Sequence, residues 1–121
     1  MRSKNRKIKR GEVWVTDLNP GYGVEIHKKR PVVVISNDLI NNHSLRIIVL
    51  PFTTQVHPLN AGKVLIPKNE YSLEKESAIL VSDIRSIDKI RLITKIGLLS
   101  SQKLFEVEES LGLVLGMTEL N

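Results

Sequence analysis

The chain has no cysteine, very few aromatic residues, and no apolar run close to the roughly 18 residues of a membrane span. Without cysteine there is no disulfide, no thiol chemistry and no cysteine-based zinc site. Its three histidines are scattered and form no metal-binding motif, so we expect neither a metal site nor a cofactor. No membrane segment is expected, and no apolar stretch follows the basic start as it would in a signal peptide.

What the chain does contain is enough material for one compact domain, with 121 residues of which 41% are hydrophobic. Residues 1–10 are rich in cations and predict a basic arm that is mobile or partly ordered. Residues 11–121 have the texture of a single folded domain. The formal net charge of +5 favours a polyanionic partner such as a nucleic acid.

The apolar pattern from Gly11 onward predicts mainly β-structure. Alternation within 11–18 indicates a half-buried strand, and the β-branched run after Pro31 indicates a strand buried on both faces. The other expected elements are a short turn or helix at 38–44, strands at 45–56 (interrupted by Pro51), 63–68 and 77–87, a connection at 71–76, and an ambiguous stretch at 88–99 that ends in a short strand. These segments make five or six strands, mostly consecutive and joined by short loops.

The last segment, residues 100–116, predicts a helix that follows a serine able to cap it. Its apolar residues recur at helical spacing and are expected on one face: Leu104, Val107, Leu111, Val114 and Leu115. Consecutive strands followed by one amphipathic helix are typical of a small antiparallel, barrel-like sheet with the helix packed on it. The fold class expected is therefore mainly β with a C-terminal helix.

Two polar clusters interrupt this apolar pattern. Proline cannot donate to a sheet ladder, so Pro31 belongs at the start of a strand, which puts Arg30 at the rim of the sheet. A second apolar run is interrupted by Pro51 and then delivers Thr53, Thr54 and Gln55. The rims of two antiparallel strands can lie side by side, and Arg30 and Thr53 would then share a pocket walled by the loop at 19–29.

A cationic rim with hydroxyl groups suits the cleavage of an RNA backbone. RNA carries its own nucleophile, the ribose 2′-OH, so the protein has to move two protons and stabilise charge at phosphorus. The donor fork of Arg30 suits the charge, and the hydroxyl of Thr53 can hold a phosphate oxygen. The candidates for the proton acceptor are Glu25, His27 and a deprotonated Arg30.

The stretch RGEVWVTDLNPGYGVEIHKKRPVVVISND resembles the opening of the MazF/PemK toxins. The shared pattern is a Gly-Glu strand, Asp-Leu-x-Pro, Gly-x-Glu, and Arg-Pro before a Val-rich strand. IIVLPFTTQ resembles the second motif of the family, and ESAILVSDIRSIDKIRL, with Arg85 and Asp88, resembles the third. Two departures are Gly23-Val24-Glu25, where a serine is common, and His27-Lys28-Lys29, where small residues are common. Together the motifs span roughly residues 10–120.

This resemblance implies an SH3-like antiparallel barrel of the MazF/PemK/CcdB type that forms a homodimer in the cytoplasm. It implies a metal-independent endoribonuclease that cuts single-stranded RNA, chiefly messenger RNA, at a short motif and leaves a 2′,3′-cyclic phosphate. A cognate antitoxin neutralises such toxins. The resemblance assigns the catalytic pair to Arg30 and Thr53.

Other residues near the two clusters are candidates for RNA binding: Tyr22, Lys28, Lys29, Thr54 and Gln55. Each also has a purely structural interpretation, as a solvated charge, a strand residue or a side chain that pins its own loop. Trp14 and the Arg85/Asp88 block are expected to be structural. Two other functions stay open: a CcdB-like toxin that binds gyrase, which needs neither Arg30 nor Thr53, and a non-catalytic RNA-binding SH3-like module.

Overall fold

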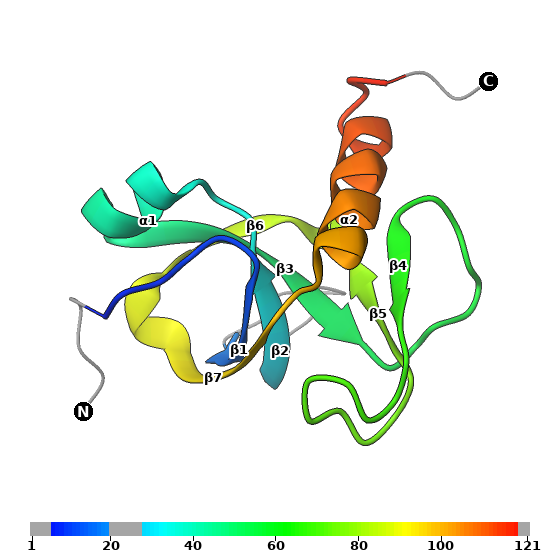
Figure 1. Cartoon of the computed structure of the whole chain (residues 1–121), viewed down its shortest axis with the longest axis horizontal. Coiled ribbons are helices and arrows are strands. Elements are labelled where there is room, and N and C mark those ends of the chain that lie inside the picture. Colours follow the sequence, from blue (N-terminus) through cyan, green and yellow to red (C-terminus); the bar gives the residue numbers. More distant parts are fainter. Residues whose placement is uncertain (1–5, 20–27, 119–121) are drawn as a thin grey trace.

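The computed structural model describes residues 6–19 and 28–118, and antiparallel strands dominate it (Figure 1). The elements in chain order are β1 (Glu12–Asp17), β2 (Lys29–Val34), α1 (Asp38–His43), β3 (Arg46–Thr53), β4 (Lys63–Ile66), β5 (Ser77–Leu80), the 3-10 turn η1 (Val81–Asp83), β6 (Arg85–Asp88), the 3-10 turn η2 (Lys89–Arg91), β7 (Leu92–Leu98) and α2 (Ser101–Val114). The predicted class, mainly β with a C-terminal helix, is confirmed.

Seven strands form one antiparallel sheet in the order β4-β5-β3-β2-β1-β7, with β6 also paired to β3. The central strand β3 pairs with β2 along one edge and with β6 and then β5 along the other. Pro51 lies between the segment of β3 paired to β6, which ends at Val49, and the segment paired to β5, which begins at Phe52. The missing N–H of Pro51 therefore falls where the ladder changes partner, and β3 runs through the proline instead of ending there.

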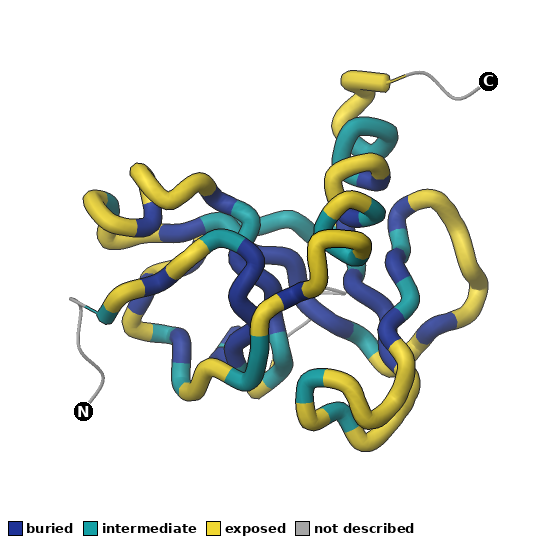
Figure 2. Tube along the Cα trace, in the orientation of Figure 1, coloured by how far each residue is buried: buried dark blue, intermediate teal, exposed yellow. Residues whose placement is uncertain are grey.

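The central strands are buried on both faces, as the β-branched run predicts. Val33 and Leu50 belong to a core that α2 covers, whereas Val32, Val34 and Val49 face a second core. Successive side chains of a strand point to opposite faces, so these neighbours divide between the two cores. Figure 2 shows the buried segments in the central strands and the exposed ones in the connections at 57–61 and 67–76.

The expected single strand at 77–87 is wrong, because it divides into β5 and β6 at η1. Both halves run along β3, and at the start of η1 the N–H of Val81 donates to the carbonyl of Gly62 at 2.8 Å, which continues the register of β5 with β4. Val81 is fully buried in the core under α2. This corner adds a strand to the five or six expected, and the ambiguous stretch at 88–99 forms the full strand β7 rather than a short one.

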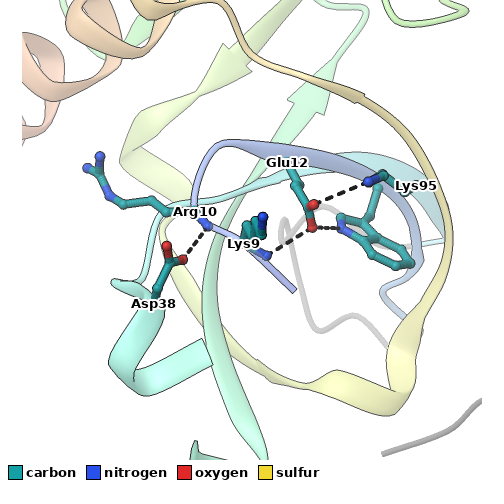
Figure 3. Close-up of polar contacts among 6 residues, drawn as sticks. Lys9, Arg10, Glu12, Asp38 and Lys95 are labelled. Atoms are coloured by element: carbon teal, nitrogen blue, oxygen red, sulfur yellow. Dashed lines mark hydrogen bonds and ion pairs between the residues drawn. The ribbon is translucent and has the colours of Figure 1, made fainter. Parts of the chain in front are cut away.

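The part of the predicted basic arm that the structure describes packs on the sheet. Ile8 is fully buried beside Trp14, and the guanidinium carbon of Arg6 lies 5.2 Å from the centroid of the indole. The carboxylate of buried Glu12 accepts from the backbone N–H of Lys9, from the Trp14 indole and from the Lys95 ammonium (Figure 3). These contacts explain why Trp14 is a core residue, as expected.

The C-terminal helix α2 begins at its predicted cap, where the Ser100 hydroxyl accepts from the N–H of Lys103 at 3.1 Å. Four of the five predicted stripe residues face the core, but Leu115 is 52% exposed. The helix ends at Val114, and Gly116 takes a left-handed φ of 73° that reverses the chain, so Leu115 no longer follows the helical face. Neither helix in the described ranges is long and apolar enough to cross a membrane.

Candidate functional site

Arg30 stands at the beginning of β2, next to the base of the connection between β1 and β2. Its Cα partner in β1 is Thr16, and its side chain is half-buried. The base of the connection is closed by two hydrogen bonds, one from the N–H of Leu18 to the Lys28 carbonyl and one from the N–H of Lys28 to the Asn19 side chain. Lys28 reaches this position with a left-handed φ of 72°. The backbone therefore holds Arg30 at the rim.

The carboxylate of Asp17 lies beside this base. The backbone N–H of Asn19 donates to it at 3.0 Å and is the main reason why the pKa of Asp17 lies below 3.8. The charges of Lys29 and Arg91 lower this pKa further, whereas burial opposes them. Arg91 also donates to the backbone carbonyls of Asp17 and Asn19. The end of β1 is thus tied to η2 as well as to β2.

Thr53 ends β3, and its partner across the ladder is Ala78 in β5. Its hydroxyl accepts from the backbone N–H of Gln55 at 3.1 Å, which turns the chain out of the strand. The ladder between β2 and β3 pairs Val32 with Pro51, and the same antiparallel register continued by one alternation places Arg30 opposite Thr53. Residues opposite each other in a ladder point to the same face.

These two residues line one pocket of about 310 Å³. Its other lining residues are Pro31, Phe52, Thr54, Ser72, Leu73, Glu74, Lys75 and Ser77. The strand side therefore carries a guanidinium and two hydroxyls, and the opposite side comes from the connection between β4 and β5. A donor fork, a second cation and several hydroxyls around an open pocket are suited to holding a phosphate group.

The family model for PemK-like, MazF-like toxins of type II toxin–antitoxin systems matches residues 9–115. The chain belongs to this family. The endoribonuclease MazF of Staphylococcus epidermidis is 39% identical to it over 115 residues, which make up 94% of this chain and 96% of that relative.

Solved structures show the same fold. MazF from Deinococcus radiodurans superposes with a TM-score of 0.80 at 23% identity, over 93% of this chain and 99% of that one. An endoribonuclease bound to its cognate antitoxin, from a mycobacterial species, has a TM-score of 0.76 at 18% identity, with the same two coverages. The barrel-like sheet predicted from the sequence is thus the MazF fold. Within the described residues, β4 and β7 form the two ends of the sheet order, so the sheet curls without closing.

The site residues predicted for this MazF-like toxin fall into three groups. Arg30, Thr53 and Thr54 line the pocket. Lys28, Lys29 and Gln55 are exposed beside it, at the base of the β1–β2 connection and after β3. Tyr22, Glu25 and His27 lie outside the described residues, as does most of the loop that was expected to wall the pocket.

The residues that the sequence interpretation missed are those of the second wall, from Ser72 to Lys75 with Ser77. Ser72 to Lys75 stand in a stretch that the sequence marks only as a connection, Ser77 begins the strand expected after it, and no local motif distinguishes them. Arg85 and Asp88 hold the fold, as expected, but not through each other. Arg85 pairs with Asp83, and Asp88 pairs with Arg46 at 3.6 Å.

Proposed function

We propose that this chain is an endoribonuclease toxin that cleaves single-stranded RNA, chiefly messenger RNA, at a short sequence motif without a metal ion. The observation that carries the proposal is the single pocket in which Arg30 and Thr53 meet from the ends of neighbouring strands. Membership of the toxin family and a 39%-identical relative that is an endoribonuclease support the same activity.

The reaction begins when the ribose 2′-OH attacks the adjacent phosphorus and gives its proton to a basic group. The bond from phosphorus to the 5′-oxygen then breaks, and that oxygen takes a proton. The products are a 2′,3′-cyclic phosphate and a 5′-OH end. Arg30 stabilises the charge on the non-bridging oxygens and donates the proton to the leaving oxygen, while the Thr53 hydroxyl orients the phosphate.

The pH dependence of the rate identifies the proton acceptor. Arginine alone is a poor base, because its ordinary pKa lies above about 12. A rate that rises through about pH 6.5 assigns the acceptor to His27, and a rise near about pH 4.3 assigns it to Glu25. A rate that rises through neither of these values leaves a deprotonated Arg30 as the acceptor. His27→Gln and Glu25→Gln variants separate the first two cases.

The cations around the pocket provide for the binding of the RNA backbone. Lys28 and Lys29 on one side and Lys75 on the other contact phosphates of the flanking nucleotides. Thr54 and Gln55 contact the nucleotide next to the cleaved bond, and Tyr22 stacks on a base. The RNA thus lies across the pocket from the β1–β2 connection to the β4–β5 connection.

An RNA-cleaving toxin of this family also implies protein partners. We propose a homodimer in the cytoplasm, where the RNA substrate is found, held inactive by a cognate antitoxin. A structural relative solved as a complex with its cognate antitoxin supports the last point.

The deciding experiment incubates the purified protein with a long single-stranded RNA in the presence of EDTA and maps the new ends. Arg30→Ala and Thr53→Ala are compared with Arg46→Ala and Thr94→Ala, which change the same residue types at exposed positions outside the pocket. We expect cuts at one short motif with cyclic phosphate ends, a loss of roughly 10²–10³-fold for Arg30→Ala, and wild-type rates for both controls.

RNA that stays intact contradicts the proposal. Tight binding of RNA that stays intact, with Arg30→Ala changing little besides the affinity, identifies an RNA-binding module instead. Growth arrest that persists in the Arg30→Ala variant identifies a toxin of the gyrase-binding kind.

A further inference from the structure

The second wall of the pocket is part of an irregular connection without helix or strand. This connection runs from the end of β4 to the beginning of β5, and three of its non-glycine residues, Asn69, Tyr71 and Ser72, have left-handed φ values of 72°, 51° and 59°. Such conformations cost energy and persist only where surrounding contacts enforce them. Two internal hydrogen bonds, Asn69 N–H to the Leu73 carbonyl and Leu73 N–H to the Glu70 carbonyl, shape the turn but do not tie it to the sheet.

Tyr71 ties the beginning of this wall to β7 and α2, while the Ser77 hydroxyl of β5 donates to the Lys75 carbonyl at its other end. Its ring lies against Gly97 of β7, where a Cβ atom added to the glycine would come within 2.7 Å of the Tyr71 Cδ1 atom. Only a residue without a side chain lets the ring approach this closely. The neighbouring Leu73 packs against the core under α2, so the turn has two points of attachment on the sheet side.

The hydroxyl of Tyr71 completes a helix cap that the helix cannot complete alone. In a capping box, the N-cap serine bonds the N3 backbone N–H, and an N3 glutamate or glutamine bonds the N-cap N–H. Ser100 makes the first bond, to the N–H of Lys103. Lysine has no acceptor, so Lys103 cannot make the second. The N–H of Ser100 donates to the Tyr71 hydroxyl instead, at 3.3 Å.

We propose that Tyr71 is a positioning residue for RNA cleavage, which fixes the wall from Ser72 to Lys75 against Arg30 and Thr53 by anchoring it on Gly97 and on the first turn of α2. The proposal rests on the RNA-cleaving function proposed above. The wall from Ser72 to Lys75 follows Tyr71 directly in the chain. The two groups that Tyr71 contacts, Gly97 and the N–H of Ser100, are far from the wall in sequence. Any shift of the β7–α2 junction therefore moves the wall, whereas Arg30 and Thr53 stay on their strands.

The experiment compares kcat and KM for a short RNA in wild type, Tyr71→Phe, Gly97→Ala and Tyr71→Phe/Lys103→Gln. The first variant removes only the hydroxyl, and the second displaces the ring. The third supplies the missing capping-box acceptor at N3, so it repairs the helix cap without restoring the anchor. Gly112→Ala is the control for Gly97→Ala, because its added Cβ would come within 2.8 Å of the Thr118 hydroxyl and so makes a similarly close contact away from Tyr71. Hydrogen exchange of the Ser100 amide reports the cap itself.

We expect Tyr71→Phe to raise KM roughly three- to tenfold with kcat within about twofold, and to speed exchange at Ser100. Gly97→Ala should raise KM at least as much, because it displaces the whole ring and the hydroxyl with it. The variant with Lys103→Gln should recover Ser100 protection and keep the raised KM. Gly112→Ala should match wild type.

Three outcomes overturn the proposal. KM that returns to the wild-type value with Lys103→Gln means that the hydroxyl serves only the helix. Unchanged KM in both single variants means that the wall does not depend on the anchor. Unchanged exchange at Ser100 in Tyr71→Phe means that the hydrogen bond is not formed in solution.

Failure of the proposed function looks different, because wild type then leaves RNA intact. The same variants are in that case compared by their Kd for an RNA that carries 2′-O-methyl groups. A three- to tenfold weaker Kd in Tyr71→Phe supports the anchor without catalysis, and equal Kd values overturn it.

Discussion

The two sides of the pocket are held in different ways. Arg30 and Thr53 stand at the ends of β2 and β3, and the strands behind them are packed into two cores. The residues opposite, Ser72 to Lys75, belong to a mostly exposed connection with left-handed backbone angles and a single aromatic anchor. One side is built by the fold itself and the other is attached to it.

The difference teaches how such a site divides its tasks. Groups that stabilise a transition state must be held within fractions of an ångström, which a doubly packed strand provides. Groups that select or bind a substrate tolerate small displacements and suit a connection whose sequence can change without cost to the core. We therefore assign the chemistry to the strand side and a share of substrate binding to the connection.

The largest expected effect is the loss of stability when a core residue on the strand side of the pocket is truncated. Phe52 is 2% exposed, belongs to the core under α2 and lines the pocket, so Phe52→Ala should lower the free energy of unfolding by about 3–5 kcal/mol. Leu73→Ala, on the half-buried anchor of the connection, should cost about 1–2 kcal/mol. Urea denaturation measures both, and equal losses would contradict the division between the two sides.

A smaller effect separates the two cations of the pocket. Arg30→Lys keeps the charge and loses the donor fork, so kcat should fall roughly a hundredfold. Lys75→Ala, on the connection, should leave kcat nearly unchanged and reduce the slope of log affinity against log salt concentration by roughly one. Steady-state kinetics at several salt concentrations test this prediction. If both variants lower kcat, or if both change only the salt dependence of affinity, the two sides of the pocket do not have different tasks.

The turn that follows Thr53 is held by a lysine of β4. The Lys63 ammonium donates to the carbonyls of Gln55, Val56 and Pro58 at 3.2, 3.4 and 3.0 Å and so holds the turn that follows Thr53. Lys63→Met should lower the free energy of unfolding by about 1–2 kcal/mol and speed amide exchange at 54–56. Lys68→Met, at an exposed position of the connection, is the control and should change neither quantity.

The smallest effect lies away from both sides of the pocket. The backbone N–H of Arg10 donates to Asp38 at 2.7 Å and, with the Asn41 side chain and nearby cations, lowers the pKa of Asp38 below 3.8 against the opposing effect of burial. The carboxylate therefore stabilises the fold above pH 3.8, and this stabilisation is lost as pH falls below that value.

Asp38→Asn should therefore be less stable than wild type at neutral pH, and this difference in stability should shrink as the pH falls to about 3. RNA cleavage should not change. Thermal unfolding at several pH values measures the difference. A stability difference that grows toward acid pH would show that folding does not lower the pKa of Asp38.

Much of the fold follows from local pattern. The β-branched run after Pro31 predicts burial on both faces, and Val32, Val33 and Val34 of β2 are fully buried. Ser100 caps its helix as its position predicts, because a cap needs only neighbours in sequence. The pattern fails where a distant partner intervenes. The expected strand at 77–87 breaks at η1, where Val81 is buried in the core under α2, and the sheet binds Ile8 in a stretch that reads as a basic arm.

The sequence by itself determined most of the strands, the capped helix and the position of Arg30 at the start of its strand, because side-chain alternation and proline chemistry act over a few residues. Only the tertiary structure decided that residues 72–75 form the opposite wall and that Tyr71 takes over the capping acceptor that Lys103 lacks. Both depend on which distant segments the order of strands in the sheet brings together. A short motif reports burial and backbone preference but not the partner across the pocket.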